Sequence, residues 1–180
     1  MQTIFLMLLV LWTPAILARD TKLVRDGVEM HVSARTPEQI RAFYSARGMP
    51  EAGLQALSQA CFLTVGLHNR RPATLWLEPA QWRFFDAEGK PIEAISRQTW
   101  KARWNALNVP LAAQATFGWT QLPESRDLYP QESVGGNVSI HPPPGSFSLR
   151  ARFRTGTDGT GEMLELVIPK LNCSSTEIKP

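Results

Sequence analysis

The sequence predicts a mainly β protein: an antiparallel β-sandwich with two helices near its N-terminus and one helix inserted between later strands. An α+β fold is the alternative. Three observations support the sandwich. Several short segments alternate apolar and polar residues with a period of two, which is typical of half-buried strands. Turn-forming Gly, Pro, Asn and Asp residues separate these segments, and helical spacing is confined to a few stretches of the chain.

The strand pattern is clearest at 147–154, where apolar residues alternate with serine and arginine. Segment 133–140 contains Gly135 and Gly136, so we expect it at a sheet edge or at a bulge. Segment 113–119 also alternates, which predicts a strand with Trp119 in the core; Trp82 is expected in the core too. The complete set of predicted strands is 28–33, 63–68, 74–77, 82–85, 92–95, 113–119, 133–140, 147–154 and 163–168.

Two helices are predicted within 36–61. Thr36, Pro37 and Gln39 form a capping-box start, with proline at the first helical position. Pro50 opens the second helix, and spacing places Cys61 on its buried face at the helix end. The inserted helix is expected at 96–107, where Trp100 and Trp104 lie one turn apart on one face.

The N-terminal segment 1–18 is predicted to be a signal peptide, because an apolar run is followed by a small-residue cleavage site at Ala18. A retained membrane anchor is the alternative, but the run 4–18 is shorter than the roughly 20 residues that span a bilayer. Cleavage leaves one predicted domain, 19–180, in the periplasm or outside the cell.

Cys61 and Cys173 are the two cysteines of the chain, and in an oxidising compartment the pair is predicted to form a disulfide. The alternative is two free thiols for redox chemistry or metal binding. No second cysteine lies at CxxC spacing, which favours the disulfide.

The sequence contains no GxSxG elbow, HExxH pair, P-loop or EF-hand loop. A non-catalytic protein is therefore predicted, although a hydrolase with a dispersed site stays open because triads are defined by geometry. The formal net charge is +3, which is too small to indicate a nucleic-acid binder.

The order of the segments 63–69, 75–77 and 82–85, followed by Asp86 and Gly89, resembles exported immunoglobulin-like domains of bacteria. Segment 128–138 is similar to those domains as well, and the resemblance covers about residues 62–173. It implies an immunoglobulin-like sandwich that works as a binding or accessory module of uncharacterised function. The chain departs from antibody-type domains because its cysteines do not bracket a tryptophan at the usual inter-sheet spacing.

Arg150, Arg152 and Arg154 stand at alternate positions of one predicted strand, which places three guanidinium groups on one sheet face. They are candidates for contacting an anionic partner such as a lipid headgroup, a polysaccharide or an acidic protein surface. The alternative is a solvated face that is partly neutralised by Glu165 and other acids on neighbouring strands.

Trp100 and Trp104 are the candidate aromatic anchors, because the inserted helix must bury that face either on its own sheet or on another molecule. The favoured partner-binding surface joins these two rings to the three arginines. The partner would be an envelope protein or an anionic surface.

A metal-handling role, with copper as the cofactor, is the alternative function. Its candidate ligands are Met30, His31, His68 and His141, because Met and His side chains suit copper outside the cytoplasm. Alternation, however, sends Met30 and His31 to opposite faces of one strand. The sequence therefore favours an exported, non-catalytic binding or accessory protein without a cofactor.

Overall fold

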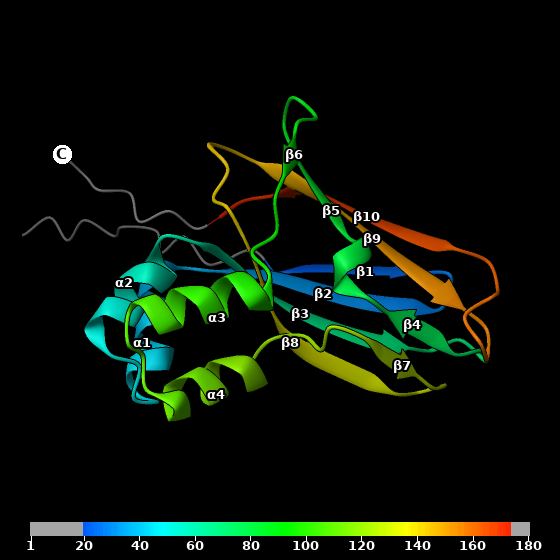
Figure 1. Cartoon of the computed structure of the whole chain (residues 1–180). Coiled ribbons are helices and arrows are strands. Elements are labelled where there is room, and N and C mark those ends of the chain that lie inside the picture. The colour runs from blue at the N-terminus through cyan, green and yellow to red at the C-terminus, as the bar shows by residue number, and fades with distance from the viewer. Residues whose placement is uncertain (1–19, 174–180) are drawn as a thin grey trace, which may run out of the picture.

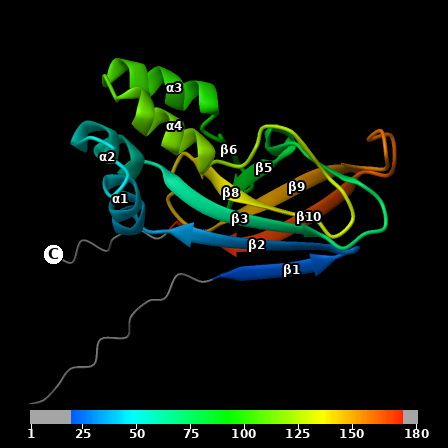
Figure 2. The ribbon, with the colours of Figure 1, turned by 90° about the horizontal axis from the view of Figure 1, so that it is seen from below.

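The computed structural model describes residues 20–173, so the predicted signal peptide at 1–18 lies outside the described residues. Two antiparallel sheets lie face to face as a β-sandwich, and the helices gather at one end of it (Figures 1 and 2). The predicted mainly β fold class is confirmed. Within residues 20–173, no helix combines the length and the apolar character needed to cross a bilayer.

The first sheet has four strands in the order β1-β2-β3-β8. β1 and β2 form a hairpin whose two-residue loop, Asp26 and Gly27, has positive φ at both positions (50° and 75°), as a type I′ turn requires. This turn joins two strands, and the sequence prediction missed the first of them. The strands are β1 (Thr21–Arg25), β2 (Val28–Arg35), β3 (Cys61–Asn69) and β8 (Ser133–Ile140).

The second sheet has the order β6-β5-β9-β4-β7, and β10 pairs with the other edge of β9. The long strand β9 organises this sheet, because β5 and β4 both pair with it on the side opposite to β10. Its strands are β4 (Leu75–Leu77), β5 (Arg83–Asp86), β6 (Pro91–Ile92), β7 (Arg126–Leu128), β9 (Phe147–Thr155) and β10 (Leu164–Leu171).

Alternation along the strands builds the main core between the two sheets. Along β9, residues 147, 149, 151, 153 and 155 are buried, while Arg150 and Arg152 are exposed. Trp82 is 3% exposed in this core, as predicted, and its ring packs edge-on against Phe153. Each fully buried large apolar side chain contributes about 1.5–3 kcal/mol relative to an exposed one.

Four helices cover one end of the first sheet. α1 (Pro37–Ser45) begins with the predicted capping box, in which the Thr36 hydroxyl accepts from the Gln39 N–H and the Gln39 side chain accepts from the Thr36 N–H (3.1 Å each). α2 (Glu51–Ser58), α3 (Arg97–Ala106) and α4 (Leu111–Trp119) follow. The predicted helices at 36–61 and 96–107 are thus present.

The segment 113–119 is helical, so the predicted strand there is wrong. Three alanines within α4 favour the helix, and Pro110 precedes its first residue. The apparent alternation arose because alanine was counted as an apolar residue of a strand. In the helix, Ala113 and Phe117 share the buried face. Trp119 points away from it and is 85% exposed, which corrects its predicted core position.

β8 lies at an edge of the first sheet, as its two glycines predicted. A Cβ on Gly136 would lie 2.5 Å from the backbone nitrogen of Leu122. Because Gly136 has no side chain, the segment after α4 can run alongside β8, and the Asn137 N–H and C=O bond to the backbone of Thr120 and Leu122. This segment covers part of the sheet edge.

Cys61 and Cys173 form the predicted disulfide. Cys61 is the first residue of β3 and not the end of α2 as expected, because the chain leaves the helix at Ser58 and the strand begins three residues later. Cys173 follows β10. The bond therefore links the two sheets of the sandwich, and under the chain-entropy model its closed loop of 112 residues stabilises the fold by about 4–5 kcal/mol.

Candidate functional site

The outer face of the second sheet carries a group of arginines that we call the arginine face: Arg83, Arg150, Arg152 and Arg154. Arg150, Arg152 and Arg154 project from alternate positions of β9, as the sequence predicted. Arg83 on β5 lies directly opposite Arg150 in the antiparallel register, and both side chains are exposed. Like charges that face each other across two strands repel, so this pair raises the positive potential of the face.

The four arginines differ in how their charge is balanced. Arg152 pairs with Glu165 on β10 (Nε to Oε2, 2.7 Å), and Arg154 pairs with Glu78. The predicted partial neutralisation by Glu165 is therefore present. Within the described part of the chain, Arg83 and Arg150 form no ion pair; Arg150 lies over the Phe85 ring, 5.0 Å from its centroid. The free positive charge thus concentrates at Arg83 and Arg150.

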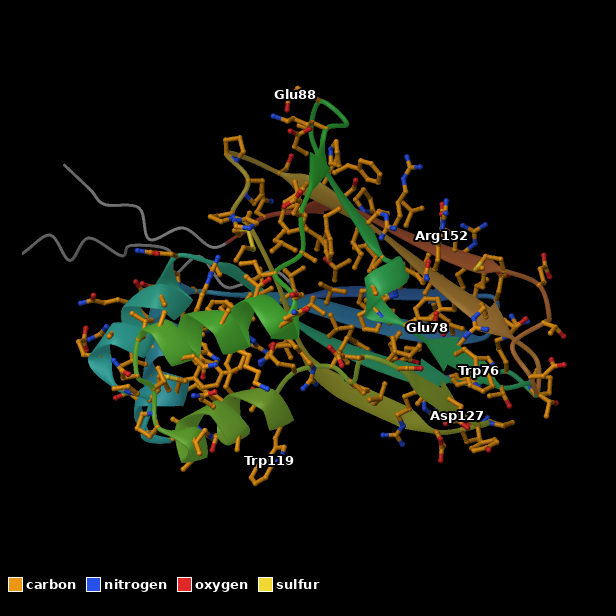
Figure 3. The ribbon with its side chains drawn as sticks, in the orientation of Figure 1. Trp76, Glu78, Glu88, Trp119, Asp127 and Arg152 are labelled. Carbon is orange, nitrogen blue, oxygen red and sulfur yellow. A yellow bond between two sulfur atoms is a disulfide. The ribbon has the colours of Figure 1, made fainter. Side chains whose placement is uncertain are left out.

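A shallow cavity of about 280 Å³ lies beside the arginine face. Trp76 on β4 forms one wall, with its indole N–H donating to the Gly156 carbonyl (2.7 Å) and the Arg154 guanidinium 5.7 Å from its ring centroid. Figure 3 shows Trp76, Glu78 and Arg152 on the same side of the molecule, well apart from Trp119. The cavity is lined by Trp76, Glu78, Gln81, Arg152, Arg154 and Met163.

Sequence reasoning missed Arg83 and Trp76, although alternation carries the signal for both. Trp76 stands between two buried leucines, and Arg83 stands between the buried Trp82 and Phe84. A residue flanked by two core residues on a strand faces outward. The buried neighbours of Arg83 and Trp76 therefore place both side chains on the outer face of the second sheet.

The two tryptophans expected to form part of the partner surface are buried instead. Trp100 and Trp104 are 1% and 2% exposed and stack with their ring centroids 4.8 Å apart. The Trp100 indole N–H donates to the Ser139 hydroxyl on β8 (2.8 Å), and Phe62 and Phe117 pack against the pair. α3 buries its apolar face on its own sheet, so these rings and the arginines do not form one exposed surface.

The four candidate metal ligands do not come together. Met30 is fully buried between the sheets, whereas His31 lies on the opposite, exposed face of β2, as alternation predicted. His68 bonds to the Ser133 hydroxyl (2.8 Å), and His141 is exposed beyond β8. Among residues 20–173, no group of three or more His, Cys, Asp or Glu side chains is placed to hold a metal ion.

Glu29 organises a cluster of charges on the exposed part of the first sheet. Its carboxylate contacts Lys22 Nζ (2.6 Å), His31 Nε2 (2.7 Å) and an Arg70 guanidinium nitrogen (2.5 Å). These contacts, with the bond from Lys22 as the largest cause, lower the pKa of Glu29 from 4.5 to about 2. Three basic side chains of its own fold contact this carboxylate, which indicates a structural role.

A groove of about 430 Å³ lies between α1 and the first sheet. Arg35 Nε donates to the Thr64 hydroxyl, which donates to Asn137 Oδ1 (2.8 Å each). Tyr44 bonds to Thr120 (2.6 Å) beneath it, and burial raises the pKa of its hydroxyl. The network joins the helices to the sheet.

A mostly apolar cleft of about 530 Å³ opens between α3, β8 and the start of β5. Several of its polar groups are engaged within the fold. The Arg97 guanidinium donates to the carbonyls of Gly118, Gln121 and Leu122 at the end of α4 (2.8–3.2 Å), and Ser139 accepts from Trp100. Two buried N–H groups of the lining, Trp82 Nε1 and Arg97 Nε, have no hydrogen-bond partner among the described residues.

No protein-family model and no curated protein sequence matches the chain. Two solved structures from Bacillus subtilis are similar to it: the yjhA protein (9% identity, TM-score 0.44, 73% of this chain and 76% of that chain) and ycdA, named as a candidate lipoprotein (11% identity, TM-score 0.45). The second match covers 84% of this chain but only 39% of ycdA. Likeness at this level carries no functional argument, and the immunoglobulin-like resemblance stays a prediction.

Proposed function

We propose that this protein is a non-catalytic binding or accessory protein that works outside the cytoplasm and recognises an anionic partner through the arginine face. The proposal keeps Arg150, Arg152 and Arg154 from the sequence prediction. It replaces the buried tryptophan pair with Arg83 and the neighbouring ring of Trp76.

The observation that supports this proposal most strongly is the Arg83–Arg150 pair. Arg83 and Arg150 stand opposite each other on adjacent strands, where like charges repel, and neither forms an ion pair with a described carboxylate. Arg83 Nη1 donates to the carbonyls of Ala80 and Trp82 (2.8 Å each), which bind the guanidinium without neutralising its charge. A bound anion would relieve this repulsion and could accept two-pronged hydrogen bonds from a guanidinium group. Trp76 adds an apolar surface close by, where a partner could pack against the ring.

Two further observations fit a place outside the cytoplasm. The Cys61–Cys173 disulfide suits an oxidising compartment, and the segment 1–18 has the pattern of a signal peptide. A metal-handling role has weaker support, because Met30 is sealed in the core and His31 is held by Glu29.

Retention on immobilised heparin, a sulfated polysaccharide, tests the arginine face with a defined polyanion. We expect the triple variant Arg83→Gln, Arg150→Gln, Arg152→Gln to elute at clearly lower salt than the unaltered protein. A neutral dextran column should retain neither protein, because the interaction requires negative charge.

The matched control is the triple variant Arg25→Gln, Arg41→Gln, Arg126→Gln, which removes the same net charge from exposed positions elsewhere. It should elute close to the unaltered protein. Equal losses in both variants would show that heparin senses only the overall charge, and the arginine face would then be rejected as the binding surface.

A further inference from the structure

The outward face of α4 is apolar although no described part of the chain covers it. Leu111, Ala115 and Trp119 recur every four residues, so they form one stripe along the helix. Leu111 is 80% exposed and Trp119 is 85% exposed. α4 contains no charged residue, and an uncharged helix with few polar side chains is usually buried. The stripe therefore indicates a surface that is covered in use.

Positive charge borders this stripe. The segment 94–123, which contains α3 and α4, carries Arg97, Lys101 and Arg103 and no acidic residue. Arg97 and Lys101 line the crevice between the two helices, together with Ala115 and Gly118 of α4. Apolar and cationic side chains thus share one side of the helix pair.

We infer that the surface formed by Leu111, Ala115, Trp119 and Lys101 docks the protein on an anionic lipid membrane. Tryptophan is favoured at the level of lipid headgroups, and an exposed leucine can enter the acyl boundary beside it. Lysine near the surface is attracted to acidic headgroups. This inference concerns a different surface from the arginine face and does not depend on it.

Two features favour a membrane over a protein as the occupant. The stripe is a narrow ridge on one nine-residue helix, and its two large side chains offer much less area than the about 800 Å² per partner of a standard protein interface. A second copy of this chain would bring its own Lys101 to the contact, and the two like charges would repel.

The ridge is already rigid, so docking requires no refolding. Phe117 anchors α4 in the helical core, 5.1 Å from the Trp104 ring centroid. Arg97 ties the end of α4 to the start of α3 through the Gly118 carbonyl (3.0 Å). Trp119 and Leu111 are exposed, so their replacement should leave the fold intact.

Co-sedimentation of the exported protein with phosphatidylglycerol vesicles tests the inference, with phosphatidylcholine vesicles run in parallel. We expect binding to the anionic vesicles and weaker binding to the neutral ones. The double variant Leu111→Ser, Trp119→Ala should reduce affinity by about tenfold or more. Lys101→Gln should reduce it by about fivefold, because one cation near an anionic surface contributes that much. Trp119 fluorescence should shift to shorter wavelength on binding.

Tyr129→Ala is the matched control, since it removes an exposed aromatic side chain (55% exposed) from the loop after β7 and should leave binding unchanged. Absence of binding to phosphatidylglycerol would overturn the inference. Loss of binding in the arginine-face triple variant, but not in the Leu111/Trp119 variant, would overturn it in favour of the arginine face. A dimer that dissociates on Trp119→Ala would overturn it in favour of self-association.

Discussion

The outer faces of the two sheets are built from different side chains and are covered differently. One end of the first sheet carries Phe62 and the buried Ser139, and helices α1–α4 lie over them. The outer face of the second sheet carries Arg83, Arg150 and Arg152 and stays open. Helices cover the end of the first sheet that carries Phe62, whereas no described segment covers the guanidinium groups of the second sheet.

This difference explains why Trp100 and Trp104 could not serve as exposed anchors. β3 places Phe62 on the helix side of the first sheet, between two residues that face the sandwich core. An uncovered phenyl ring would lose the free energy of burial, and the inserted helix supplies the covering rings. α3 therefore belongs to a second hydrophobic core, and its two tryptophan rings are not available for recognition.

The largest expected effect comes from removing a ring of that second core. Trp100→Ala should lower the free energy of unfolding by about 3–5 kcal/mol, because it leaves a cavity beside Phe62 and Phe117 and leaves Ser139 without its donor. Urea denaturation followed by circular dichroism measures this loss.

The control for this substitution is Trp119→Ala in the same helical layer. Because Trp119 is 85% exposed, the change in the free energy of unfolding should stay within about 0.5 kcal/mol. A loss for Trp119→Ala as large as that for Trp100→Ala would contradict the assignment of one ring to the core and the other to the surface.

The disulfide is the covalent link between the covered sheet and the open sheet. The double variant Cys61→Ala, Cys173→Ala should lower the free energy of unfolding by about 2–5 kcal/mol, because the unfolded chain regains the freedom of a loop of 112 residues. Thermal unfolding of the oxidised protein, the reduced protein and the variant provides the comparison. Equal melting temperatures for all three would show that the bond does not restrict the unfolded state.

Local patterns predicted the parts of the fold that depend on neighbours in sequence. The strict alternation of β9 gave both its buried row and its outward arginines, and the capping box at Thr36 gave the start of α1. The disulfide followed from cysteine count and compartment. Each of these features is determined by a few adjacent side chains or by composition.

The parts that were not predicted depend on contacts between distant segments. In α4, alanine fits a strand pattern and a helix pattern equally, and packing of Phe117 against Trp104 and Tyr44 fixes the helix. The strand β1 has little apolar alternation and forms because the Asp26–Gly27 turn folds it onto β2. Arg83 lies opposite Arg150 only because of the register between β5 and β9, and a register between distant segments cannot be predicted from the local sequence pattern.

A substitution on the arginine face should change stability by a smaller amount and in the opposite direction, because it should stabilise the protein. Arg150→Gln should raise the free energy of unfolding by about 0.2–1 kcal/mol at low salt, because it removes the repulsion from Arg83 across the two strands. The gain should vanish in high salt, which screens exposed charges. Arg152→Gln, which breaks an exposed pair with Glu165, should show no such gain; a gain of equal size would mean that general charge repulsion dominates over the Arg83 pair.

The contribution of Glu29 to the uncovered end of the first sheet can be tested through the pH dependence of the free energy of unfolding. Its pKa in the folded protein, about 2, lies below its ordinary 4.5, so its contribution is fully present above about pH 4.5 and is lost as the pH falls toward 2. Glu29→Gln should therefore destabilise the protein at pH 6 and much less at pH 2.5, as measured by urea unfolding midpoints.

The control is Glu88→Gln, which removes an exposed carboxylate from the turn after β5 and should have little effect at either pH. If Glu29→Gln had equal effects at both pH values, contacts of the uncharged side chain would explain its role, and the ion pairs with Lys22 and Arg70 would not be what stabilises this part of the sheet.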